Sequence, residues 1–142
     1  MSMVMAAARR QPRSGCPISM ALELLGDAWS LLIVRDLMFK DRCTYNDFLE
    51  SGEGIASNVL ADRLRKLQAA NIIEKRRDPV DARRFVYRLT AKGIDLAPVL
   101  VELVVWSARH AQTDAPAAVV RSMRNDRSAF LSDVRRRWRA EA

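Results

Sequence analysis

A chain of 142 residues is long enough to bury one hydrophobic core and short for a core plus a separate catalytic domain. Its 24 Lys and Arg residues outnumber its 17 Asp and Glu residues, and the net charge of +7 favours a polyanionic partner. Two cysteines and one histidine are too few for a disulfide framework, a structural zinc site or histidine-based catalysis. We therefore expect one domain without enzyme activity, metal or cofactor.

The apolar segments do not fit a membrane span or a secretory signal. The longest, Leu96 to Trp106, is interrupted by Glu102 and falls short of the roughly 20 residues that a spanning helix needs. The apolar patch at 3–8 precedes Arg9 and Arg10 instead of following them, which is the reverse of a secretory signal. We expect a cytoplasmic protein that does not contact membranes.

The first third of the chain is predicted to hold a basic tail and two helices. Residues 1–15 show no periodicity, which indicates a flexible tail. Apolar residues at helical spacing predict a helix over 18–25, with Gly26 as its C-terminal cap. Asp27 is suited to cap the next helix, 28–39, which is apolar nearly all round and should form the centre of the core.

Two more helices are predicted on either side of a glycine-containing turn. Thr44 is placed to cap a third helix, which stops in the turn at 51–54. A fourth helix is predicted over 56–70, with one buried face, and Asn71 suits the left-handed residue that ends it. The buried stripe of this fourth helix consists of Leu60, Leu64 and Leu67.

A hairpin is predicted directly after the fourth helix. Residues 72–76 and 85–89 are typical of two strands around the polar loop 77–84. Two helices joined by a tight turn and followed by a hairpin form a winged helix-turn-helix, whose second helix enters the major groove. The expected fold class is mainly α with a small β-hairpin: a winged helix-turn-helix with terminal dimerisation helices.

The C-terminal part is predicted to contain two long amphipathic helices. Thr90 caps the first, which reaches His110 and which Pro98 would bend. Its expected buried side consists of Leu96, Val99, Leu100, Leu103 and Trp106. The second, 117–140, has an apolar stripe that would cover the partner subunit, cover its own domain or leave a basic arm facing DNA, and we rank partner contact first. The stripe consists of Val120, Met123, Arg127, Phe130, Val134 and Trp138.

The polar face of the 56–70 helix is the candidate DNA-reading surface. It consists of Ser57, Asn58, Ala61, Asp62 and Arg65. Asn58 can bond adenine in a bidentate way, Arg65 can read guanine or hold a phosphate, and Ser57 can bond a phosphate. Asp62 repels phosphates, so it either accepts a bond from cytosine or, as we favour, braces Arg65 or Lys66. Taken alone, this face also fits an ordinary solvated helix surface.

The basic hairpin favours the DNA-binding interpretation. It carries Lys75, Arg76, Arg77, Arg83 and Arg84. A concentration of charge directly after a candidate recognition helix suits phosphates or the minor groove. As a solubility feature it would be self-repelling, although Asp78 and Asp81 reduce that repulsion. We therefore expect double-stranded DNA as the partner.

Several short motifs lie between Cys16 and His110. They are Cys16-Pro17, Leu25-Gly26-Asp27-Ala28-Trp29, Leu32-Ile33-Val34-Arg35-Asp36-Leu37, Tyr45-Asn46-Asp47-Phe48, Gly54-Ile55, Arg63-Leu64, Ile72-Ile73 and Tyr87-Arg88-Leu89-Thr90-Ala91-Lys92-Gly93. Together they resemble the HxlR-type winged helix regulators, relatives of the MarR group. The resemblance implies a dimeric DNA-binding repressor or activator with a recognition helix at 56–70 and a wing near 77–84. Thr44-Tyr45, Ala56 and Asn71 depart from the family pattern.

The two cysteines are interpreted differently. Some members of the family sense oxidants or electrophiles through the cysteine that matches Cys16, so the resemblance implies a thiol switch there; the alternative is a small packed cysteine without redox duty. Cys43 lies outside the family pattern and is interpreted as an incidental turn residue. The sequence indicates no particular effector.

The combined hypothesis is a sequence-specific transcription regulator, with repression as the expected direction, that acts as a homodimer on an inverted-repeat operator. The chain divides into the tail 1–15, a DNA-binding domain 16–112 and a C-terminal amphipathic helix 113–142 for dimerisation. One rival is a nonspecific nucleic-acid-binding or architectural protein, which would bind scrambled DNA equally well. A second is a protein-interaction winged helix, which would show no salt-dependent DNA affinity.

Overall fold

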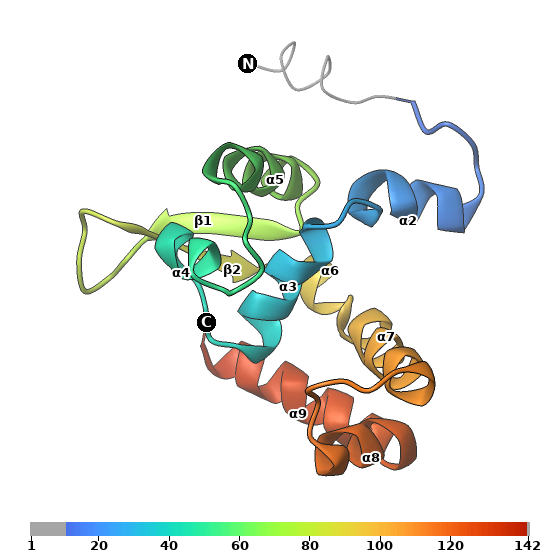
Figure 1. The fold of residues 1–142 in the computed structure, drawn as a ribbon. Helices are drawn as coiled ribbons and strands as arrows, with labels where there is room; N and C mark the ends of the chain where they lie inside the picture. Colours follow the sequence, from blue (N-terminus) through green and yellow to red (C-terminus); the bar gives the residue numbers. More distant parts are fainter. Residues whose placement is uncertain (1–10, 142) are drawn as a thin grey trace.

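The computed structural model describes residues 11–141 and shows a mainly helical chain with one antiparallel hairpin (Figure 1). This confirms the expected mainly α fold with a small β-hairpin. Arg9, Arg10 and the rest of the predicted tail up to residue 10 lie outside the described range. In Figure 1, α3 lies at the centre, α5 lies above it, the hairpin extends to the left, and α7, α8 and α9 form the lower part.

The first two helices, α2 (Pro17–Leu25) and α3 (Ser30–Phe39), are joined by a tight corner. Gly26 is the C-terminal cap of α2, as predicted, and its conformation is right-handed, with φ −80°. A glycine is still required, because a Cβ at Gly26 would lie 2.4 Å from the Leu22 carbonyl oxygen. The Asp27 carboxylate accepts the Trp29 and Ser30 amides at the start of α3, but the N-cap position is held by Trp29 and the helix begins two residues later than predicted, at Ser30.

The helix-turn-helix consists of α4 (Tyr45–Leu49) and α5 (Ser57–Ala69). Thr44 caps α4 as predicted, and its hydroxyl accepts the amide of Asp47, whose carboxylate in turn accepts the Thr44 amide. The leucine stripe of α5 is buried, and Asn71 is left-handed with φ 61°, both as predicted. The cap, the leucine stripe and the left-handed residue could be predicted from the sequence because each depends only on residues a few positions away.

The hairpin pairs β1 (Ile73–Arg77) with β2 (Phe85–Leu89), so β1 lies one residue later than predicted. The outer edge of β2 is also occupied. The Tyr87 amide donates to the Cys43 carbonyl at 2.7 Å, and the indole N–H of Trp138 donates to the Leu89 carbonyl at 2.9 Å.

The helix predicted from Thr90 to His110 is two helices, α6 (Ala91–Ile94) and α7 (Ala97–His110). Thr90 caps α6 as predicted, but Pro98 lies in the first turn of α7, where proline is tolerated, and does not bend a longer helix. The buried side of α7 also differs from the predicted one. The buried residues are Ala97, Leu100, Val101 and Val105, whereas Val99, Leu103 and Trp106 are exposed.

The last predicted helix is also divided, into α8 (Ala117–Asn125) and α9 (Arg127–Ala140), with a break at Asp126. Much of its apolar stripe packs against the chain's own domain, which is the second of the three alternatives and not the one ranked first. Met123 and Val134 are buried, and Phe130 and Trp138 pack against the core.

The core has two clusters of buried residues, a main one around α3 and a smaller one that joins α7 to α8. Buried residues from α3, α5, both strands, α7 and α9 form its main cluster. Within residues 11–141, no single helix combines the length and apolarity needed to cross a membrane; α2 and α3 meet the criterion only as a pair, bent by 80° at their junction.

Candidate nucleic-acid interface

The outward face of α5 carries the predicted DNA-reading residues. Ser57, Asn58 and Arg65 are exposed, whereas Ala61 and Asp62 are half-buried. The three buried leucines hold the opposite face against the core. In addition, the Tyr45 hydroxyl donates to the Ser57 carbonyl at 2.9 Å, which links α4 to the start of α5. The polar face is thereby presented to solvent by a helix fixed from behind.

Asp62 forms ion pairs with Arg65 and Lys66, the two basic side chains that it was expected to brace. Its carboxylate lies 3.5 Å from Arg65 and 3.3 Å from Lys66, and it also accepts a hydrogen bond from Arg63. Slight desolvation raises the pKa of Asp62, but the neighbouring Lys66 and Arg63 outweigh it and lower the pKa below its usual value. The charge of Asp62 is therefore balanced by three basic side chains of its own helix.

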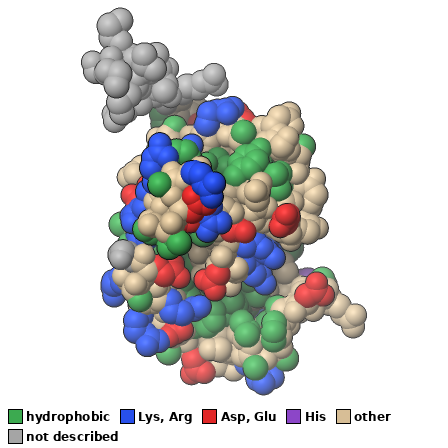
Figure 2. Space-filling model, turned by 90° about the vertical axis from the view of Figure 1, so that its left-hand side faces the viewer, with side chains coloured by type: hydrophobic (Ala, Val, Ile, Leu, Met, Phe, Trp, Pro, Cys, Tyr) green, Lys and Arg blue, Asp and Glu red, His purple; other side chains and the backbone are tan. Residues whose placement is uncertain are grey.

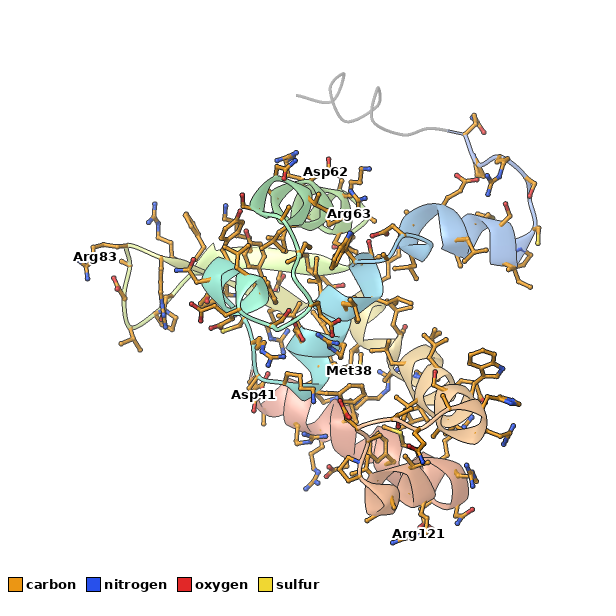
Figure 3. The ribbon with its side chains drawn as sticks, viewed as in Figure 1. Met38, Asp41, Asp62, Arg63, Arg83 and Arg121 are labelled. Atoms are coloured by element: carbon orange, nitrogen blue, oxygen red, sulfur yellow. The ribbon has the colours of Figure 1, made fainter. Side chains whose placement is uncertain are left out.

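Arg63 connects α5 to the corner between α2 and α3 (Figure 3). Its Nε donates to the Asp27 carboxylate at 2.9 Å, and its side chain is 23% exposed. Asp27 also accepts the amides of Trp29 and Ser30 at 2.9 and 3.0 Å. Burial alone would raise the pKa of Asp27, but the hydrogen bonds from Ser30, Trp29 and Arg63 lower it to about 2.

Neither Asp27 nor Arg63 was predicted to belong to the site. Asp27 was assigned only a capping role, and Arg63 appeared only within a family motif. The available signal was the position of Arg63 next to Leu64, at the border of the buried stripe, where a long basic side chain lies across a neighbouring element.

The five predicted basic residues of the wing all lie on the hairpin or its loop, and all are exposed. Lys75 and Arg77 lie over the Phe85 ring, 4.3 and 5.0 Å from its centroid. Arg76 pairs with Glu74, and Arg83, whose side chain is 91% exposed, pairs with Asp81 at 3.1 Å. Figure 2, which looks onto the hairpin side, shows Lys and Arg interspersed with Asp and Glu.

Arg84 differs from its neighbour because it helps to hold the loop in shape. It pairs with Asp78, whose side chain is 6% exposed. Asp78 also accepts the Val80 amide at 2.9 Å, and this bond, followed by that from Arg84, lowers the pKa of Asp78. The loop therefore has a defined shape from which Arg83 projects (Figure 3).

The two cysteines lie in different surroundings. Cys16 is exposed at the start of α2, where Arg13 donates to Ser19 and, through its backbone amide, to Glu23. Cys43 is half-buried, and burial, followed by the charge of Asp47, raises the pKa of its thiol. Among residues 11–141 there is no cluster of three or more His, Cys, Asp or Glu residues that could hold a metal ion.

A recognition-type helix after a tight turn, followed by a basic hairpin, defines a winged helix-turn-helix protein. The model of the HxlR-like helix-turn-helix family matches residues 24–115, more than half of the chain. The chain belongs to the HxlR-like helix-turn-helix family, as its motifs indicated.

Individual relatives agree with this assignment. An HTH-type transcriptional regulator of Synechocystis, sll1512, is 35% identical over 88 residues, which are 62% of this chain and 64% of the relative. The regulator YodB of Bacillus subtilis is 32% identical over 93 residues, 65% of this chain and 82% of YodB. The chain thus spans less than two thirds of the length of the Synechocystis relative. These relatives are named as regulators and not as enzymes, in agreement with the expectation that the chain is no enzyme.

Solved structures share the fold. The reduced form of YodB superposes with a TM-score of 0.57 at 30% identity, covering 70% of this chain and 97% of YodB. YodB has also been solved in quinone-bound and diamide-treated forms. The oxidized form of the redox regulator HypR, at 22% identity and a TM-score of 0.61, covers 69% of this chain and all of HypR and supports the fold alone.

Proposed function

We propose that the chain binds duplex DNA in a sequence-specific way and regulates transcription as a homodimer on an inverted-repeat operator, with repression as the expected direction. The observation that carries this proposal is the solvent-facing polar side of α5 next to a hairpin with five exposed basic residues. A helix of this diameter fits the major groove, which is about 12 Å wide. The adjacent hairpin would then contact the phosphates or the minor groove.

Each predicted DNA-reading residue of α5 has a distinct role in this proposal. Asn58 reads adenine through its amide, Ser57 bonds a phosphate, and Arg65 reads guanine or holds a phosphate. Ala61 lies where a small side chain permits close approach to a thymine methyl group. Asp62 keeps Arg65 and Lys66 in place and does not touch the DNA itself.

The wing residues divide into those that bind phosphates and one that holds the loop. Arg83 is the main phosphate or minor-groove contact because it projects furthest into solvent. Lys75, Arg76 and Arg77 add charge along the strand. Arg84, which pairs with the buried Asp78, preserves the loop shape and contributes less direct contact.

Homodimerisation is supported by apolar side chains that the monomer leaves uncovered. On α2, Ile18 and Leu22 are 72% and 56% exposed, and on α7, Trp106 is 60% exposed. Patches of this kind usually mark contact surfaces. We therefore assign the partner contact chiefly to α2 and α7, because much of the stripe of α8 and α9 is used within the monomer. A two-fold dimer would place the two recognition helices roughly 34 Å apart.

A thiol response at Cys16 is a second part of the proposal. Cys16 is exposed, and the structures of YodB include a diamide-treated form. Oxidant is expected to lower the operator affinity of the wild type and to leave Cys16→Ser unchanged. If both proteins respond equally to diamide, Cys16 is not the sensor.

Selection of bound duplexes from random DNA tests the main proposal. We expect an enriched inverted repeat, with Asn58→Ala altering the preferred base at one position of each half-site. Arg83→Ala should weaken binding to operator and scrambled duplexes alike and reduce the salt slope by about 0.9 for each phosphate that is no longer neutralised. Equal affinity of the wild type for every duplex at moderate salt would identify a nonspecific binder instead.

A further inference from the structure

Arg63 occupies a distinct position among the basic residues of α5. Arg65 and Lys66 are 70% and 69% exposed, whereas the Arg63 side chain is 23% exposed and lies between Asp27 and Asp62. Its guanidinium therefore has carboxylates on two sides. A side chain held in this way is poorly placed to contact a phosphate, so any role in DNA binding must be indirect.

The Asp27 end of this contact is firmly fixed. The same carboxylate caps the start of α3 through the Trp29 and Ser30 amides and also accepts the Ser30 hydroxyl. The residue before it, Gly26, allows no larger side chain because of the Leu22 carbonyl. Asp27 is thus a fixed anchor at the corner that leads into α3, the central helix of the core.

The other tethers of α5 do not fix its orientation as strictly. The leucine stripe is held by apolar packing, which has little directionality, and the Tyr45 hydroxyl bonds only the first turn. The Arg63–Asp27 pair joins the middle of α5 to a residue 36 positions earlier and has a defined geometry. It therefore restricts rotation and sliding of α5 over the core.

We propose that Arg63 is a positioning residue that sets the orientation of the recognition helix, and with it base specificity, through its ion pair with Asp27 and without touching DNA. This inference rests on the proposed function. Arg63 also neutralises Asp62, so its loss would leave a carboxylate on the DNA-facing side with one cation fewer. Both effects act on the fit of α5 in the groove and neither removes a phosphate contact.

The test compares Arg63→Gln and Arg63→Lys with the wild type. Fluorescence anisotropy would measure the affinity for the selected operator and for a scrambled duplex over a series of salt concentrations. We expect Arg63→Gln to lose about tenfold in operator affinity, comparable to one mismatched base pair, with little change on the scrambled duplex. The salt slope should stay at the wild-type value, and Arg63→Lys should recover part of the loss.

Arg127→Gln is the matched control, because it removes an Arg–carboxylate pair with Glu102 that joins α9 to α7, away from α5. It should leave the ratio of operator to scrambled affinity unchanged. Thermal unfolding of each variant identifies the temperature range in which all are folded, and binding is compared there. Asp27→Asn should reproduce the loss of specificity, and the double variant should cost little more than either single change.

Three results would overturn the inference. A salt slope reduced by about 0.9 in Arg63→Gln would make Arg63 a phosphate contact. A lower melting temperature of Arg63→Gln with an unchanged ratio of operator to scrambled affinity would limit Arg63 to a role in stability. Additive effects of Arg63→Gln and Asp27→Asn on that ratio would show that Arg63 does not act through its ion pair with Asp27. If the wild type prefers no duplex, the proposed function itself fails, which is a different outcome from all three.

Discussion

Asp27 links several parts of the fold through one charged group. Burial raises its pKa, but the hydrogen bonds from Ser30, Trp29 and Arg63 outweigh burial and hold the pKa at about 2. Since the pKa is lower in the folded state than in the unfolded state, ionised Asp27 stabilises the fold above about pH 4. That contribution is lost as the pH falls towards 2.

Asp27→Asn is therefore expected to lower the free energy of unfolding by about 1–2 kcal/mol at neutral pH. The difference from the wild type should narrow between pH 5 and pH 2, where the wild-type carboxylate becomes protonated. Urea unfolding at a series of pH values measures both quantities. A difference that stays constant over this range would mean that the charge of Asp27 does not stabilise the fold.

Gly93 lies where α6 passes close to Ile72, the residue before β1. A Cβ at this position would meet the Ile72 carbonyl oxygen at 2.2 Å, a contact with backbone that cannot easily move. Gly93→Ala is expected to lower the free energy of unfolding by about 1–3 kcal/mol through this overpacking. Gly15→Ala is the control, because nothing lies within 4 Å of a Cβ there, and equal losses in the two variants would contradict the prediction.

The structural role of a residue could be predicted where its partners are close in the sequence, and not where they are far away in the sequence. Thr44 and Asn71 were identified because capping and the left-handed stop depend on residues within one helical turn. The partner of Arg63 lies 36 positions away, and no local pattern relates Arg63 to Asp27. The candidate site was therefore predicted as a surface but without the contact that orients it.

At the level of elements, α9 fastens the C-terminal end of the chain to the base of the wing. The guanidinium of Arg88 lies over the Trp138 ring, 4.8 Å from its centroid, and donates to the Trp138 carbonyl at 2.8 Å. The Trp138 indole donates to the Leu89 carbonyl. This helix lies beyond residue 115, where the family match ends.

Trp138→Phe is expected to lower the free energy of unfolding by about 1 kcal/mol, because the ring remains while the hydrogen bond to the Leu89 carbonyl is lost. Trp138→Ala, which also removes the partly buried ring, should cost roughly 3 kcal/mol. Denaturant unfolding of the two variants separates the contributions. A cost for Trp138→Phe equal to that for Trp138→Ala would show that the aromatic ring retained in Trp138→Phe contributes nothing, which would contradict the prediction.

The elements that sequence reasoning misjudged share one cause. The apolar pattern continues across the breaks at 95–96 and at Asp126 because the two helices beside each break contact a shared cluster. Ile94 of α6 and Leu100 of α7 belong to the main cluster, whereas Met123 of α8 belongs to a second cluster against which Phe130 of α9 also packs. Periodicity records which residues are apolar and not where the backbone turns. The existence of the helices was therefore predictable, whereas their division and the buried side of α7 were not.

On the scale of the whole molecule, the uncovered apolar faces of α2 and α7 require an explanation. If they meet in a homodimer, Trp106→Glu should convert the protein to monomers, because it places a charge in the contact. The melting temperature of the wild type should rise with concentration, and that of the variant should not. Analytical ultracentrifugation measures the mass directly, and Val119→Glu on α8, where the side chain is 37% exposed, is the control.

A dimeric mass that persists in Trp106→Glu would exclude this contact surface. In that case α8 and α9 would regain the role that the sequence first suggested for them. Val119→Glu should remain a dimer if the contact is formed by α2 and α7. Conversion of Val119→Glu to monomers would instead place α8 in the contact.

The occupied outer edge of β2 has a consequence for how the protein survives at high concentration. A two-stranded sheet with free backbone groups along one side is a template on which a strand from another chain can grow. Here the Tyr87 amide and the Leu89 carbonyl are already bonded to Cys43 and Trp138, so a strand added along β2 would have to displace both contacts. Trp138 of α9 therefore hinders strand addition at the base of the wing as well as supporting the hairpin.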